Sequence, residues 1–243
     1  SYFTMIDVEI CIDCTDQVVA LAAASAALEG GAKRIECCRD MQQGGLTPDL
    51  SILQEIVDVV GGKMEIVVMI RPREGDFQFS RPERLTMLTQ AQEIIAMGVD
   101  GIVFGSVIDG QVDEVLCEEM ALYASYNGVK STFHRAFDAL SDPLAALEFL
   151  SEAHFQRILT SGTPWGSNQS AEAGIENLNA YAIEAPSMEV VIGGGVHAQN
   201  VSSLLSSFSG RRFSFHAYSS VLENGRTSAA KVKELVEMAQ KTR

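Results

Sequence analysis

Two Glu-x-Cys pairs are the first residues in this sequence whose types and spacing could do chemistry. Glu9 with Cys11 and Glu36 with Cys38 each close an apolar run typical of a β-strand. Residues two apart on a strand point to the same face, so each pair offers a carboxylate and a thiol to one site. Neighbouring parallel strands lie about 4.8 Å apart. We therefore expect the two pairs to converge on one small pocket.

A second group of candidates carries charged or titratable side chains. Its members are Arg71, Arg73, His134 and Asp138. They could bind an anionic substrate and move a proton, as a carboxylate near an imidazole often does. The alternative is an ion-pair network that closes the pocket around the two glutamates, because partly buried carboxylates need cations nearby to stay charged. The residue types alone allow both interpretations.

These side chains can meet only if the elements that carry them form one fold. Eight β-rich runs recur at roughly regular spacing, at residues 5–10, 34–38, 65–70, 101–104, 130–134, 157–160, 189–192 and 212–216. Most are continuously apolar, which is typical of strands covered by helices on both faces. Helical patterns with start signals lie between them, such as the Ser80-Arg81-Pro82-Glu83 capping box. Eight such units predict an α/β fold, a TIM (β/α)8 barrel, rather than an open sheet.

No linker interrupts this alternation, so residues 1–243 are expected to form a single TIM-barrel domain. Functional residues of such a barrel lie at the C-terminal ends of its strands. The polar and glycine residues at those ends are Glu9, Cys11, Glu36, Cys38, Arg71, Arg73, His134, Arg135, Asp138, Ser161, Gly162, Gly193, Gly194, Gly195 and His216. Bare amides in the glycine loops could hold a phosphate. The glycines could equally serve only to turn the chain tightly.

The composition argues against polyanionic partners. With 18 basic and 32 acidic side chains the formal charge is -14, which opposes binding to nucleic acid or to an anionic membrane surface. Neither a signal pattern nor an apolar run of membrane-spanning length is found in the sequence. We therefore expect a cytoplasmic protein. Five cysteines are an odd number in a chain too large to need disulfides, so reduced thiols are expected.

Several stretches together resemble the copper homeostasis protein CutC family. They are the two Glu-x-Cys strand ends, GGLTP at 44–48, IRPREGDF at 70–77, FHRAFD at 133–138, LTSG at 159–162 and GGGV at 193–196. They keep the family's order and span nearly the whole chain. The resemblance implies a cytoplasmic TIM-barrel protein linked to copper tolerance and copper binding, often a homo-oligomer such as a dimer or tetramer. Glu74 and residues 163–170 depart from the family pattern.

Within that resemblance, Cys11 and Cys38 match the family's two strand-end cysteines. Two soft thiolates suit Cu(I) better than any hard cation. Zinc would need further ligands, which only His134 or a glutamate could supply. The alternative is that both cysteines are small buried hydrophobic residues. By strand alternation Cys37 is expected to face the helix layer. Cys11 and Cys14 spell a C-x-x-C, but its first cysteine ends a strand, whereas a redox motif has that cysteine at the start of a helix.

Two hypotheses of function remain open. In the first, the protein is a cytoplasmic copper homeostasis factor that binds Cu(I) through Cys11 and Cys38. In the second, it is an enzyme acting on a small anionic or phosphorylated metabolite, and its copper role is indirect. The candidate catalytic residues are then His134, Asp138, Glu36 and Glu9. The candidate anion-binding residues are Arg71, Arg73, Arg135, Ser161, Gly162, Gly194, Gly195 and His216.

Overall fold

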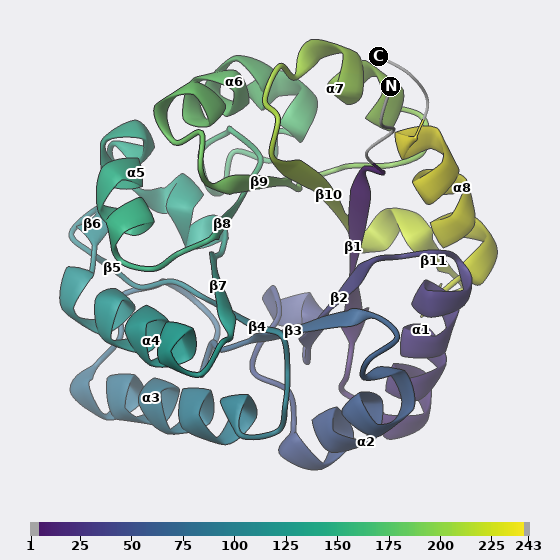
Figure 1. The fold of residues 1–243 in the computed structure, drawn as a ribbon, viewed down its shortest axis with the longest axis horizontal. Coiled ribbons are helices and arrows are strands. Elements are labelled where there is room, and N and C mark those ends of the chain that lie inside the picture. Colours follow the sequence, from purple (N-terminus) through teal and green to yellow (C-terminus); the bar gives the residue numbers. More distant parts are fainter. Residues whose placement is uncertain (1–4, 241–243) are drawn as a thin grey trace.

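Eight parallel strands close into a barrel in this computed structural model, which describes residues 5–240 (Figure 1). The barrel strands are β1 (Asp7–Asp13), β2 (Arg34–Cys38), β3 (Glu65–Met69), β4 (Gly101–Phe104), β7 (Lys130–Phe133), β8 (Arg157–Thr160), β9 (Glu189–Ile192) and β10 (Phe213–Ala217). Each pairs with the next in this order, and β10 pairs with β1 to close the ring. The predicted α/β barrel is confirmed.

An outer ring of helices covers the strands (Figure 1). The described α-helices are α1 (Gln17–Glu29), α2 (Leu50–Val60), α3 (Arg81–Ile95), α4 (Glu114–Tyr126), α5 (Pro143–Glu152), α6 (Ile175–Glu184), α7 (Val201–Ser207) and α8 (Ala229–Ala239). Short 3-10 helices are η1 (Met41–Gln43), η2 (Arg135–Ala139), η3 (Ala171–Gly174) and η4 (Ser219–Val221). Two small hairpins join β5 (Val107–Ile108) to β6 (Gln111–Val112) and β11 (Leu222–Glu223) to β12 (Arg226–Thr227). None of the described helices is both long and apolar enough to cross a membrane.

Local signals explain where several helices begin. Ser80 accepts a hydrogen bond from the backbone of Glu83, and the Glu83 side chain accepts one from the backbone of Ser80, so the predicted capping box is present at α3. Asp142, just before Pro143, caps α5 by accepting a hydrogen bond from the backbone N–H of Ala145. Thr47 lies three residues before α2, whose N-cap is Asp49. Its hydroxyl accepts a hydrogen bond from the Arg71 backbone, which ties two loops of the barrel mouth together.

The first strand runs further than its apolar pattern predicts. β1 continues to Asp13, so Glu9 lies in mid-strand and not at the strand end. In the parallel ladders Glu9 is opposite Arg34 on β2 and opposite His216 on β10. Cys11, two residues on, is opposite Glu36. The expected placement of Glu9 at the rim is therefore wrong by about one layer of side chains.

Strand alternation separates two apolar cores. A small cluster inside the barrel contains Cys11, Cys38, Val67, Met69 and Val103. Residues of opposite parity pack outward in a much larger core between the strands and the helices. Cys37 lies in that outer core, as predicted, and so do Cys14 and Cys117.

Ion pairs fill the N-terminal end of the barrel. Arg34, Glu65, Arg157 and Glu189 are the first residues of β2, β3, β8 and β9. Arg34 contacts Glu9 and lies 3.0 Å from Glu189, and Arg157 lies 2.9 Å from Glu65. The predicted network around the glutamates thus exists for Glu9, but it uses Arg34 and closes the end opposite the mouth. Charges at that end of a TIM barrel serve stability.

We predict that Arg34→Met destabilises the fold, because it leaves Glu9 buried without its cation. Urea unfolding at neutral pH should show a loss of about 3–5 kcal/mol, against little change for the exposed control Arg211→Met. Burial alone would raise the pKa of Glu9, but the Arg34 charge and the His216 hydrogen bond lower it below its usual 4.5. The carboxylate therefore stabilises the fold above pH 4.5 and less as the pH falls below it. Wild-type stability in Arg34→Met would contradict this role.

Candidate functional site

A cavity of about 240 Å³ opens at the C-terminal ends of the strands. Its lining residues are Cys11, Glu36, Met41, Gly44, Met69, Arg71, Phe77, His134, Arg135, Leu159, Trp165 and His216. Among the described residues, three other hollows are larger. Those of about 310 and 340 Å³ lie beside α5 and share Leu140, Ser141 and Asp142, and one of about 410 Å³ lies beside Phe77 and Trp165. The smaller cavity is the candidate site, because it gathers residues from many strand ends.

Three sulfur atoms lie together at one side of this cavity. The Sγ of Cys11 is 3.8 Å from the Sγ of Cys38 and 3.6 Å from the Sδ of Met41. Both cysteines are buried. We call Cys11, Cys38 and Met41 the sulfur cluster. The expected convergence of the two cysteines is therefore seen in the geometry, and Met41 is a member that the sequence did not indicate.

The loop after β2 brings Met41 back over the strand end. Gly45 has φ +91°, in the region that favours glycine, and a Cβ on it would lie 3.3 Å from Cys38 Sγ and 3.5 Å from Met41 Sδ. Gly45 thus allows the turn and leaves room for the sulfurs of Cys38 and Met41. This is a physical reason for glycine at position 45.

Both thiols of the sulfur cluster hold their protons at neutral pH. The hydrogen bond with Cys38 favours the Cys11 thiolate, but burial and the Glu36 carboxyl outweigh it and raise the pKa of Cys11 to about 12. The hydrogen bond with Cys11, together with burial, raises the pKa of Cys38 well above its usual value. A metal ion that binds here must therefore displace thiol protons.

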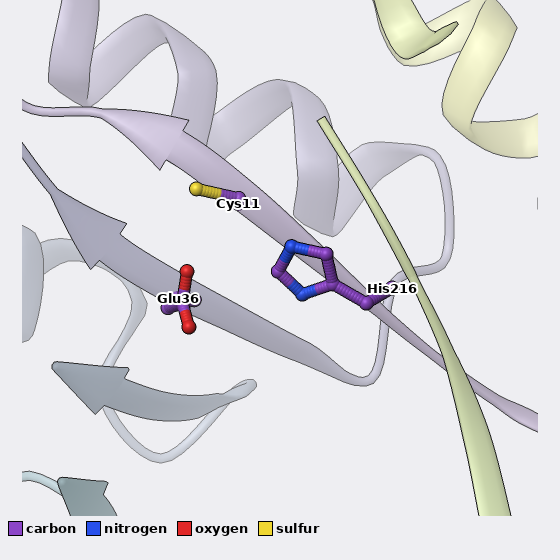
Figure 2. A group of neighbouring side chains, drawn as sticks. All are labelled: Cys11, Glu36 and His216. Carbon is purple, nitrogen blue, oxygen red and sulfur yellow. The ribbon is translucent and has the colours of Figure 1, made fainter. Parts of the chain in front are cut away.

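Cys11 also belongs to a mixed set of ligand atoms. Figure 2 shows Cys11 on β1, Glu36 on β2 and His216 on β10, and one ligand atom of each lies within 4.8 Å of the others. Nδ1 of His216 is 2.7 Å from Oε1 of Glu9, which leaves Nε2 for a ligand. A carboxylate behind a histidine commonly orients a metal ligand. The nitrogen near the thiols thus comes from His216, and not from His134 as the sequence suggested.

The charge state of His216 is set by its neighbours. Burial would lower its pKa, but the hydrogen bond to Glu9 and the charges of Glu36 and Glu9 raise it above the usual value. Glu36 itself is buried, and this burial raises the pKa of its carboxyl group. The raised pKa of His216 favours the protonated, charged imidazole, whereas the raised pKa of Glu36 favours the protonated, neutral carboxyl group.

His134 is a neutral hydrogen-bond donor. Its Nδ1 accepts from the backbone N–H of Ala136 at 3.0 Å, so the ring proton is on Nε2. Burial and the nearby Arg71 lower the pKa of His134 to about 3. The ring packs against Phe77, with centroids 5.1 Å apart. An acid/base role for His134 would need a free ring nitrogen to accept a proton, and Nδ1 is already engaged.

Asp138 lies apart from His134 and does not line the cavity. Its carboxylate accepts hydrogen bonds from Thr160, Ser161 and Arg135. Burial is the main cause of its raised pKa. The predicted His134–Asp138 pair is not formed by these contacts. Asp138 instead holds the guanidinium of Arg135, which lines the cavity.

The two arginines after β3 differ in what they contact. Arg71 is buried and donates to the backbone carbonyls of Gln43 and Gly75 at 3.0 and 2.8 Å. Arg73 turns away from the cavity and pairs with Asp76 and Glu83. Only Arg71 of the two is therefore placed to meet a ligand in the mouth.

The glycine loops are explained by close packing. A Cβ on Gly194 would lie 2.9 Å from the Cβ of Ser161, and one on Gly195 equally close to the Cβ of Ser170. A Cβ on Gly162 would lie 2.3 Å from the carbonyl oxygen of Gly174. All three glycines have positive φ. The alternative that these glycines turn the chain tightly accounts for them, and the phosphate interpretation stays a prediction.

Trp165 is the main cavity residue that the sequence did not indicate. It lies in the 163–170 segment and packs edge-on against Phe77 at 5.2 Å between ring centroids. The guanidinium of Arg135 lies 5.4 Å from its ring centroid. The sequence offered one signal for this residue: it is the only tryptophan, and it follows a predicted strand end.

A closed parallel barrel with a polar cavity at the carboxyl ends of its strands defines a TIM-barrel protein with a mouth site. The chain matches the CutC family over residues 6–215, and it belongs to that family.

Individual relatives agree with this assignment. The chain is 38% identical over 199 residues to the copper homeostasis protein cutC homolog of Homo sapiens, covering 81% of this chain and 68% of the relative. It is 36% identical over 210 residues to a family protein CutC of Bacteroides thetaiotaomicron, covering 86% and 80%. A crystal structure of CutC from Streptococcus agalactiae superposes with a TM-score of 0.77 at 25% identity, covering 87% of this chain and 98% of that one.

We predict that Phe77→Leu loosens Trp165, because the ring against which the indole packs is lost. The emission of this single tryptophan should shift to longer wavelength and become easier to quench with acrylamide. The free energy of unfolding should fall by about 0.5–1.5 kcal/mol more than the loss of buried apolar area alone would cause. Phe79→Leu is the control, since Phe79 lies against Arg73. Unchanged emission in Phe77→Leu would show that Trp165 is not held over the cavity.

Proposed function

We propose that this protein is a copper homeostasis factor that binds Cu(I) as cargo in the barrel mouth. The observation that carries the proposal is the sulfur cluster, three sulfurs 3.6–3.8 Å apart about Cys11. Thiolate and thioether sulfurs are the ligands that Cu(I) prefers. The name of the human relative, a copper homeostasis protein, supports the same role.

The spacing of the sulfurs suits one ion bound by all three of them. A metal–thiolate bond is about 2.3 Å long, so two sulfurs on one ion are about 4.6 Å apart in a linear site, about 4.0 Å in a trigonal one and about 3.8 Å in a tetrahedral one. The distances from Cys11 to Cys38 and to Met41 are 3.8 and 3.6 Å, too short for a linear pair and close to the values for an ion with three or four ligands. We therefore assign Cys11, Cys38 and Met41 as the ligands.

The strand register favours an ion over a disulfide between these thiols. Cys11 is opposite Glu36, so Cys38 lies two residues further along the neighbouring strand. That offset separates the two Cα atoms by about 8 Å, beyond the roughly 7 Å that a disulfide can bridge. The pair is therefore suited to hold an ion between sulfurs and remain reduced.

The same chemistry supports the expected compartment and assembly. Free buried thiols fit the reducing cytoplasm, where we place the protein. The net charge of -14 disfavours nucleic acid and anionic membranes as partners. Val115, Leu122 and Tyr126 recur at i, i+7 and i+11 on one face of α4 and are 74%, 46% and 91% accessible, an exposed apolar stripe that favours assembly as a dimer or tetramer.

The enzyme hypothesis has weaker geometric support in its original form. It used His134 and Asp138 together, and the first is a neutral donor while the second holds Arg135. The mixed set of Cys11, Glu36 and His216 is the alternative metal site and would suit a harder ion such as zinc.

We predict that the reduced protein binds one Cu(I) per chain and that Cys11→Ser/Cys38→Ser weakens this binding by more than about 100-fold. Loss of supporting residues alone costs 10–100-fold at metal sites, and here the ligands themselves are removed. Competition against a Cu(I) chelator at fixed pH measures the affinity.

Cys37→Ser/Cys117→Ser is the matched control, since it removes two buried thiols from the outer core and should keep wild-type affinity. Wild-type affinity should also rise with pH, by about tenfold per pH unit for each thiol proton displaced. Undiminished copper binding by the Cys11/Cys38 variant would reduce these thiols to packing residues and reject the proposal.

A further inference from the structure

Three buried polar atoms of the barrel mouth have no hydrogen-bond partner among residues 5–240. They are Oε2 of Glu36, Nε of Arg71 and Nε2 of His134. All three side chains line the cavity of about 240 Å³, and none is more than 4% exposed. Buried polar groups in folded proteins are normally paired. Their convergence on one cavity indicates a polar ligand that is distinct from copper, since none of them is a sulfur.

Arg71 carries a charge that the described residues do not neutralise. Its terminal nitrogens donate to two backbone carbonyls, those of Gln43 and Gly75, and no described carboxylate lies within ion-pair distance of it. Arg73, two residues on, has Asp76 and Glu83 as partners. A buried guanidinium without a counter-ion favours an anion, and carboxylates fit its planar donors.

His134 is placed to share that anion. Its ring centroid and the guanidinium carbon of Arg71 each lie 5.1 Å from the ring centroid of Phe77, so both donors flank the same aromatic wall. Because Nδ1 of His134 accepts from Ala136, Nε2 presents an N–H. One carboxylate can therefore accept a charge-assisted hydrogen bond from Arg71 and a neutral one from His134.

Glu36 and the size of the cavity limit the rest of the ligand. Oε1 of Glu36 already accepts from the Cys38 thiol at 3.2 Å, and Oε2 is left to accept from a hydroxyl. At about 240 Å³ the cavity lies just below the roughly 300–1,000 Å³ of sites for drug-sized ligands, so it suits a small ligand. Met69, Leu159 and Trp165 line the remainder with apolar surface.

We propose that the barrel mouth binds a small hydroxycarboxylate, with its carboxylate at Arg71 and His134 and its hydroxyl at Glu36. The site does not require copper, because none of its three contacts is a sulfur and Glu36 accepts from the protonated Cys38 thiol when copper is absent. The overall negative charge of the chain works against anion binding, so the affinity depends on these local donors.

Racemic lactate is the probe, and propionate is its match without the hydroxyl. Titration of copper-free protein should change the Trp165 emission in a saturable way, with lactate binding about tenfold tighter than propionate, the effect of one hydrogen bond. Arg71→Gln should weaken lactate by at least about tenfold, whereas the neighbouring Arg73→Gln should leave it unchanged. Equal affinity for the two acids, or no saturable binding of lactate, overturns the proposal.

Further variants separate a lost site from a lost fold. Arg71 also ties two loops together, so His134→Phe is the second test. It keeps a ring against Phe77 and removes the Nε2 donor, together with the Nδ1 acceptor of the Ala136 N–H. It should weaken lactate and propionate alike, and unchanged affinity in it overturns the assignment of His134. Cys11→Ser/Cys38→Ser should bind lactate as the wild type does, even though it fails to bind Cu(I). Tighter binding of inorganic phosphate than of lactate would overturn the hydroxycarboxylate assignment.

Discussion

The register between β1 and its two neighbours determines which side chains meet in the barrel mouth. Glu9 is opposite both Arg34 and His216, and the buried ion pair with Arg34 holds the first of these ladders in place. Side chains alternate along a strand, so the next residues that face the barrel interior, one layer nearer the mouth, are Cys11 and, opposite it, Glu36. A slip of one residue would turn the thiols and carboxylates into the helix layer. The ion pair and the ligand atoms therefore depend on one register.

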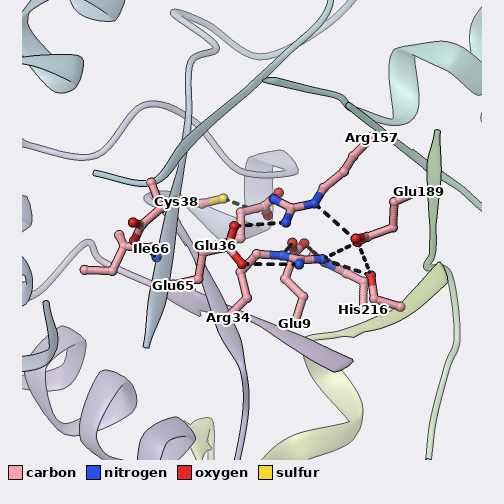
Figure 3. Close-up of polar contacts among 11 residues, drawn as sticks. Glu9, Arg34, Glu36, Cys38, Glu65, Ile66, Arg157, Glu189 and His216 are labelled. Atoms are coloured by element: carbon pink, nitrogen blue, oxygen red, sulfur yellow. Dashed lines mark hydrogen bonds and ion pairs between the residues drawn. The ribbon is translucent and has the colours of Figure 1, made fainter. Parts of the chain in front are cut away.

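The two ends of the barrel divide stability from function. At the N-terminal end the arginines and glutamates that begin the strands form ion pairs with one another (Figure 3). At the C-terminal end, Cys11 and Met41 of the sulfur cluster line one cavity with Glu36, Arg71 and His134, each of which has a buried polar atom without a hydrogen-bond partner among residues 5–240. Soft sulfurs lie toward β1 and β2, and hard donors lie on Arg71 and His134 beyond them. One cavity thus offers two chemistries, which suits a cargo metal and a small acid.

The sequence was sufficient for features that follow from periodicity and insufficient for those set by tertiary geometry. Continuous apolar runs located the eight strands, and alternation placed Cys37 in the outer core. The partner of Glu9 could not be found in this way, because pairing with Arg34 depends on the stagger between neighbouring strands. Met41 and Trp165 lie in loops, where no period shows which way a side chain points.

X-ray absorption at the copper K-edge of the Cu(I)-loaded protein tests the copper site most directly. We predict a first shell of sulfur only, three atoms at about 2.3 Å, from Cys11, Cys38 and Met41. Met41→Leu should reduce this shell to two sulfurs. A first shell containing nitrogen and oxygen would place the ion with Glu36 and His216 instead and contradict the assignment of the sulfur cluster as the copper site.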